Sequence, residues 1–168
     1  MRSTLLLALA LALPQFVSAQ TCTTSAGAFT GNDTNNLCNF TNQLAQDCAA
    51  TSFAGSTPQA IYSVTLSASS NAVIQLAAGS AFTPYIALWA QGGGCSGSTS
   101  CGSYENIGGG TGTTISLPST SGLAAGTYDL LVGDVVASSI TCPNANANYT
   151  LSVTSGSLPV KLQEFSVN

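Results

Sequence analysis

An alternation of apolar and polar residues just before residue 133 constrains the fold of this chain most strongly. After Gly126, the side chains of Tyr128, Leu130 and Val132 recur at every second position. Successive side chains of an extended strand point to opposite faces, so these three lie on one face. The pattern therefore predicts a β-strand that buries one face, and Gly126 predicts a turn before it.

Five other segments carry strand-like patterns, namely residues 62–66, 72–76, 85–90, 114–117 and 149–153. A Ser-Ser-Asn turn separates the first two, which predicts that they pair as a hairpin. The third is apolar on both faces, which predicts a central strand with Trp89 in the core. Short strands without an amphipathic helical pattern predict an all-β fold, an antiparallel β-sandwich or jelly roll. We expect Tyr62, Tyr128 and Tyr149 to face its interior.

Two segments lack a clear alternation. Residues 21–58 are rich in Thr, Asn, Gly and Ala and predict an extended arm with loops and one helical turn at residues 41–47. Residues 91–112 contain two triple-glycine runs and predict a loop. A chain of 168 residues fits one domain. We expect the sandwich to span residues 20–157, and residues 158–168 to form a tail or an extra strand.

The N-terminus has the composition of a secretory signal peptide. Arg2 supplies a positive charge, residues 5–13 are an uninterrupted run of Leu and Ala, and small residues precede Gln20. The apolar run is about half of the roughly 20 residues that a membrane-spanning helix needs. We therefore expect residues 1–19 to be cleaved. The mature protein is expected to be secreted, outside the cell or at its surface, without a membrane span.

Six cysteines follow the predicted signal peptide: Cys22, Cys38, Cys48, Cys95, Cys101 and Cys142. An even number in an oxidising compartment predicts three disulfides, and fifteen pairings are open. Local pairing would join Cys95 to Cys101. It would also join Cys38 to Cys48, which leaves Cys22 to bond Cys142. The chain has no His and no Cys-x-x-Cys pair, so we expect no metal site, no redox centre and no cofactor.

The charge content is very low, with two basic and six acidic residues. Lys161 would be the sole basic side chain after cleavage. Nucleic acid is therefore not an expected partner, because phosphates are neutralised by Lys and Arg. Weak self-repulsion favours self-association instead. One route is the C-terminal tail, which would pair with a sheet edge of a neighbouring copy, although packing on its own sheet is the simpler alternative.

Few residues are candidates for a chemical or binding site. Without His, hydroxyl nucleophiles lack their usual base. A glycoside hydrolase would need a pair of carboxylates, drawn here from Glu105, Asp129 and Asp134, but we expect these to be solvated acids on strands and loops. Tyr104 lies in the predicted loop at residues 91–112, which would also contain the Cys95–Cys101 disulfide, and is the candidate for an exposed sugar-stacking ring. We therefore expect Tyr104 and Glu105 to contribute to binding, and we expect no catalytic residue.

Four segments together resemble a known family. They are residues 61–66, 82–89, 149–153 and, as the most specific, the Leu-x-Ala-Gly-Thr-Tyr sequence at 123–128. They are similar to the bacterial pre-peptidase C-terminal domain over about residues 62–153. The resemblance implies a β-sandwich of an exported protein that assists secretion or binds substrates and surfaces without catalysis. Thr83 stands where the family often has Asp, and Glu105-Asn106 replaces a common Asn-Asp pair, so the resemblance does not imply the calcium binding of some related modules.

These observations lead to two expected functions. The first is a secreted, disulfide-stapled and non-catalytic module that binds a polysaccharide, a protein or another surface outside the cell. The second is a structural subunit of an extracellular assembly or filament, which low charge and the alternating tail favour. A carboxylate-dependent hydrolase ranks below both.

Overall fold

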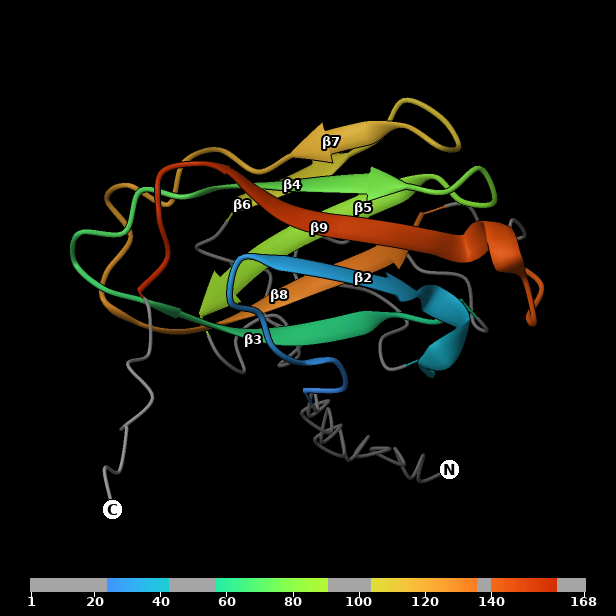
Figure 1. The fold of residues 1–168 in the computed structure, drawn as a ribbon, viewed down its shortest axis with the longest axis horizontal. Coiled ribbons are helices and arrows are strands. Elements are labelled where there is room, and N and C mark those ends of the chain that lie inside the picture. Colours follow the sequence, from blue (N-terminus) through green and yellow to red (C-terminus); the bar gives the residue numbers. More distant parts are fainter. Residues whose placement is uncertain (1–23, 43–56, 91–103, 136–139, 160–168) are drawn as a thin grey trace, which may run out of the picture.

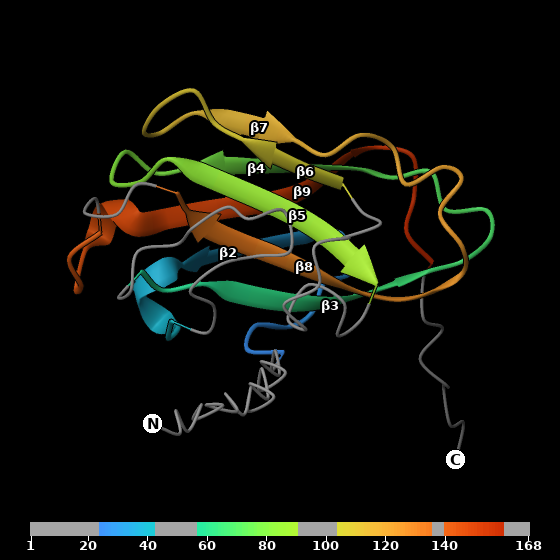
Figure 2. The same ribbon diagram turned by 180° about the vertical axis from the view of Figure 1, so that it is seen from behind.

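The chain folds into two stacked β-sheets, as a computed structural model shows for residues 24–42, 57–90, 104–135 and 140–159. The four-stranded sheet lies in front in Figure 1 and the five-stranded sheet in Figure 2. Within the described ranges, no helix is long and apolar enough to cross a membrane. The predicted all-β sandwich is therefore confirmed.

The strand order joins segments that are far apart in the sequence. One sheet has the order β1 (Gly27–Ala28), β3 (Ala60–Leu66), β8 (Gly126–Asp134), β5 (Pro84–Ala90) and β6 (Tyr104–Ile107). The other has the order β2 (Asn32–Asn36), β9 (Asn148–Ser155), β4 (Val73–Ala78) and β7 (Thr114–Ser116). Every pair is antiparallel except β1–β3. Two 3-10 turns, η1 (Leu37–Asn39) and η2 (Ala145–Ala147), lie at one end of β2 and β9.

The main core lies between the sheets and consists of the alternating residues. Tyr62, Tyr128 and Tyr149 are all buried, as predicted. They pack with aliphatic side chains from both sheets, which include Val64, Leu66, Ile74, Leu76, Ile86, Leu88, Leu130, Val132 and Leu151. Burial of each large aliphatic side chain contributes about 1.5–3 kcal/mol. The period of two in the sequence therefore identifies the layer that holds the sandwich together.

A second buried cluster explains why β5 is apolar on both faces. Ile61, Tyr85, Ala87, Trp89 and Leu131 point to the outer face of the five-stranded sheet, and all five are buried. Trp89 is fully buried, which confirms its predicted place in a core. Its indole N–H has no hydrogen-bond partner among the residues that the structure describes.

The predicted hairpin of residues 62–66 and 72–76 is wrong. β3 belongs to the five-stranded sheet, where it pairs with β8, and β4 belongs to the four-stranded sheet, where it pairs with β9. The connection between β3 and β4 therefore crosses from one layer to the other. Both strands bury their apolar rows between the sheets, as strands of either sheet can, so the alternation that predicts their burial does not specify their pairing partners.

The N-terminal arm contributes an edge strand to each sheet. β1 pairs with β3 and β2 pairs with β9, and between them Phe29 is buried with its ring edge-on to Tyr62. The 3-10 turn η1 precedes the helical turn predicted at residues 41–47, most of which lies outside the described residues. The predicted loop at 91–112 is wrong at residues 104–107, where β6 pairs with β5, and its residues 91–103 lie outside the described residues.

Candidate functional site

A disulfide joins Cys38 in η1 to Cys142 ahead of η2, with Cα atoms 5.5 Å apart. This bond corrects two of the pairings considered above, Cys38 with Cys48 and Cys22 with Cys142. The other four cysteines lie outside the described residues. The bond ties the end of β2 to the segment that leads into β9. The two cysteines are 104 residues apart in the sequence.

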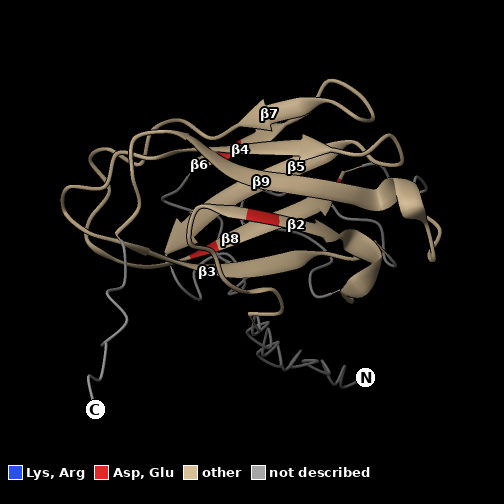
Figure 3. Cartoon of the chain, in the orientation of Figure 1, with Lys and Arg blue, Asp and Glu red and all other residues tan. Residues whose placement is uncertain are grey.

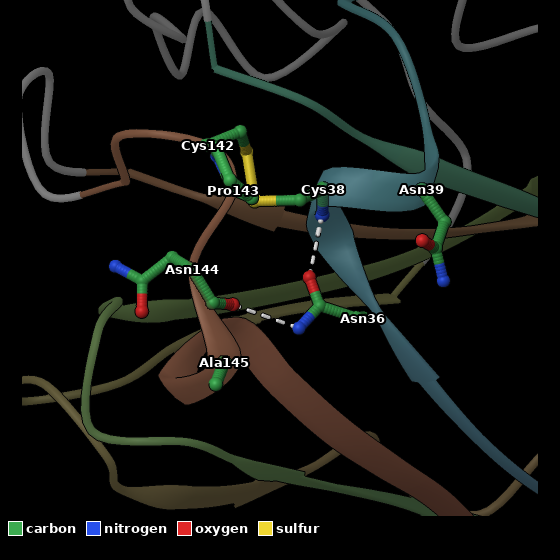
Figure 4. Close-up of a pocket in the computed structure, with 7 residues that line it drawn as sticks. All are labelled: Asn36, Cys38, Asn39, Cys142, Pro143, Asn144 and Ala145. Atoms are coloured by element: carbon green, nitrogen blue, oxygen red, sulfur yellow. Dashed lines mark hydrogen bonds between the residues drawn. A yellow bond between two sulfur atoms is a disulfide. The ribbon is translucent and has the colours of Figure 1, made fainter.

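Two surface hollows flank this disulfide. The larger has a volume of about 550 Å³ and is lined by Asn36, Cys38, Asn39, Cys142, Pro143, Asn144 and Ala145 (Figure 4). The smaller, of about 450 Å³, shares both cysteines and is lined further by Phe40, Thr41, Asn42, Pro58, Ile140 and Thr141. Every lining side chain is uncharged. The larger hollow has the size of sites for small molecules.

Asn36 holds the floor of the larger hollow together. Its side-chain oxygen accepts the Cys38 N–H at 2.8 Å and so caps η1. Its amide nitrogen donates to the Asn144 carbonyl and to Asn148 Oδ1, both at 2.8 Å. Asn is favoured at such caps because its short side chain reaches nearby backbone N–H groups. Since all its hydrogen-bonding groups are used, Asn36 joins three chain segments and fixes the hollow.

In the side-chain amides of Asn39 and Asn144, one of the two polar atoms is hydrogen-bonded. Asn39 Nδ2 donates to Asn35 Oδ1 at 2.8 Å, and Asn144 Oδ1 accepts the Asn146 N–H at 2.9 Å as the cap of η2. No residue in the described ranges bonds Asn39 Oδ1 or Asn144 Nδ2. The Asn39 acceptor and the Asn144 donor therefore stay available on side chains that are already oriented, as a pre-organised binding site requires, and Figure 4 shows them on opposite sides of the hollow.

Charge is absent from the wall of the sandwich next to this hollow. The described residues contain four acidic side chains, Asp33, Glu105, Asp129 and Asp134, and no Lys or Arg (Figure 3). Asp33 is the one acidic residue of the four-stranded sheet, and its carboxylate accepts a hydrogen bond from Tyr62 of the opposite sheet. The outer face of that sheet is consequently neutral.

The two predicted binding residues do not form an exposed platform. Tyr104 was expected in a loop but is the first residue of strand β6. Its ring is partly buried against the main core. Glu105 is exposed and accepts a hydrogen bond from the Tyr85 hydroxyl at 3.1 Å. Both residues lie on β6, an edge strand of the five-stranded sheet that pairs with β5. The larger hollow instead lies at the end of β2 and β9 in the other sheet.

The expectation that Asp129 and Asp134 are solvated is wrong, because both are buried. Asp134 Oδ1 accepts the Thr83 N–H at 3.0 Å. Asp129 and Asp134 are five residues apart on β8, so their side chains leave opposite faces of the sheet. Glu105 is two strands and two positions from Asp129, which separates their Cα atoms by about 12 Å. Asp129 and Asp134 are therefore not brought together as a carboxylate pair.

A buried polar cluster between the sheets escaped the sequence analysis. The Tyr62 hydroxyl lies 2.5 Å from Asp33 Oδ2 and 2.5 Å from the Tyr149 hydroxyl. Burial raises the pKa of both phenols above the ordinary value, and the hydrogen bond to Asp33 raises the pKa of Tyr62 further. Asp33 stands in a polar Asn-Asp-Thr-Asn-Asn run, so local periodicity carries no signal for it. The asparagines of the hollow were missed for the same reason.

Comparison with protein-family models, with curated proteins and with solved structures finds no match to this chain. Its function must therefore be argued from the residues described above.

Proposed function

We propose that this protein is an exported, non-catalytic β-sandwich module that binds a ligand or surface outside the cell. The observation that carries the proposal is the neutral hollow at the end of β2 and β9, where Asn39 and Asn144 offer oriented polar groups. Loops that cluster at the end of a rigid sandwich are common binding sites.

Two further observations support the proposal. A disulfide such as Cys38–Cys142 persists in oxidising compartments, which agrees with the signal-like N-terminus. Three carboxylates have structural hydrogen-bond partners: Asp33 with Tyr62, Glu105 with Tyr85, and Asp134 with the Thr83 backbone. The sandwich also agrees with the resemblance to pre-peptidase C-terminal domains, which implies an accessory and non-catalytic role.

The test is binding of the purified, oxidised protein to polysaccharides, collagen and cell envelopes in pull-down and titration assays. We expect saturable binding to at least one of them. The reduced and alkylated protein serves as the control for a folded site. Failure to bind every surface would overturn the proposal, as would hydrolysis of a polysaccharide by the protein.

A second candidate is a structural subunit of an extracellular assembly, which the outer edge of β2 favours, because β9 is its one partner among the described strands. Val153 N–H donates to the Gly31 carbonyl, so odd-numbered residues of this segment bond β9. The backbone groups of Asn32 and Thr34 then point away from the sheet, where another strand can pair. Electron microscopy of concentrated protein tests this candidate, and a strictly monomeric product would contradict it.

A further inference from the structure

We propose that the outer face of the four-stranded sheet and the larger hollow form one continuous site for an uncharged, hydroxyl-rich polymer, that is, a neutral polysaccharide. The inference rests on the proposed function, because it names the ligand class of the same site. It follows from the arrangement of polar groups on the face, from its lack of charge and from its continuity with the hollow.

The outward side chains of the sheet form two rows that cross all four strands. One row is Thr34, Thr150, Ala77 and Thr114, and the other is Asn32, Ser152, Gln75 and Ser116. Neighbouring members of a row are about 4.8 Å apart, and the rows are about 6.7 Å apart along the strands. Seven of the eight positions carry a hydroxyl or an amide. A repeating ligand can therefore meet repeated hydrogen-bonding groups.

A third pair of side chains connects this face to the hollow. Asn36 and Asn148 lie opposite each other on β2 and β9, one step beyond Thr34 and Thr150. Their side chains are hydrogen-bonded, and Asn36 also lines the hollow. The polar surface thus runs without a charged group from β7 across β9 and β2 to Asn144.

The chemistry of this surface favours a neutral polysaccharide over other partners. An anionic polymer needs Lys or Arg, and the described residues have neither. Protein interfaces depend on buried Trp, Tyr and Arg anchors. Among the described residues, the exposed large apolar side chain is Ile107, on β6 of the other sheet. Hydroxyl and amide groups on rigid strands instead match a ligand that both donates and accepts neutral hydrogen bonds.

The first test uses Asn144→Asp. The Asp carboxylate still accepts the Asn146 N–H and caps η2, but the two amide N–H donors that no described residue binds are lost. Asn71→Asp is the matched control, because Asn71 Oδ1 likewise accepts a backbone N–H, that of Ser157, at the opposite end of the sandwich. We expect N144D to bind the polysaccharide at least tenfold more weakly and N71D to bind as the unchanged protein does.

The second test places a bulky cation in the centre of the face with Ala77→Lys. Thr65→Lys is its control, since Thr65 is exposed on the outer side of the five-stranded sheet. We expect A77K to lose at least tenfold in affinity and T65K to lose none. Circular dichroism melts show whether each variant is folded.

The probes are insoluble cellulose, chitin, β-1,3-glucan and starch, with alginate, heparin, collagen and ice as comparison surfaces. Binding to a neutral polysaccharide that N144D and A77K weaken supports the inference. Binding confined to an anionic polymer, collagen or ice overturns this inference but leaves the proposed function in place. Equal binding by all four folded variants also overturns it. Absence of binding to every probe and to cell envelopes overturns both.

Discussion

The hydroxyl of Tyr62 on β3 donates its hydrogen to the carboxylate of Asp33 on β2, and this bond links the two sheets. Tyr149 of β9 bonds the same hydroxyl from the other side. A polar cluster therefore lies within an otherwise apolar core. Because buried polar groups are costly unless they are paired, the cluster selects one relative position of the two sheets.

Removal of the Tyr62 hydroxyl should destabilise the protein. Tyr62→Phe leaves Asp33 and Tyr149 without their shared partner in a partly buried position, which costs about 1–3 kcal/mol of unfolding free energy. Tyr149→Phe retains the bond to Asp33 and should cost about 1 kcal/mol. Urea unfolding measures both values. Tyr104→Phe is the control, and an equal effect of all three substitutions would contradict the role of the cluster.

Alkaline pH should destabilise the fold through the same two tyrosines. The pKa of each phenol is raised in the folded protein, whereas an unfolded tyrosine ionises near pH 10. The folded state holds these protons longer, so its stability is complete below pH 10 and is lost as the pH rises above it. Each tyrosine contributes a slope of about 1.4 kcal/mol per pH unit.

Unfolding titrations at pH 8, 10 and 11 measure this loss. The Tyr62→Phe/Tyr149→Phe double variant should show a smaller decline than the unchanged protein over the same range. Parallel declines in the two proteins would show that other groups cause the alkaline sensitivity.

The Cys38–Cys142 bond should contribute more to stability than a local disulfide. It closes a loop with a sequence separation of 104 residues. In the loop-entropy model, a loop of this length corresponds to about 4.7 kcal/mol. We expect the Cys38→Ser/Cys142→Ser double variant to lose a large part of this in urea unfolding. Mass spectrometry of a non-reduced digest should find the peptides of Cys38 and Cys142 joined, and a Cys38–Cys48 peptide would disprove the pairing.

Gly156 should not tolerate a side chain. Its φ is +72°, and a Cβ atom would lie 2.2 Å from the Asn71 carbonyl oxygen. Gly156→Ala should therefore cost about 1–3 kcal/mol, since a non-glycine residue in this region of backbone space is strained. Gly109→Ala is the control, because its Cβ would meet no atom within 4 Å. Similar melting temperatures for the two variants would refute the expected strain.

Strand positions and buried faces could be predicted from the sequence because alternation is a local property. Tyr128, Leu130 and Val132 identify the buried face of β8 without any knowledge of its neighbours. The two-sided apolar pattern of β5 likewise identified Trp89 as a core residue. β6 was missed, because its four residues Tyr-Glu-Asn-Ile are too few and too polar to stand out in a glycine-rich segment.

Pairing partners and the candidate site were decided by the tertiary structure. β3 joins β8 across 60 to 72 residues of sequence, and Cys38 joins Cys142 across 104, distances at which a local pattern specifies nothing. The hollow needs Asn36 and Asn144, which the antiparallel pairing of β2 with β9 brings within hydrogen-bonding distance. The sequence by itself determined which apolar side chains of the strands are buried, since their alternation depends on neighbours along the chain, but not that Asp129 and Asp134 are buried beside them. The folded structure alone decided which surfaces meet, since that depends on how two whole sheets bury their apolar faces together.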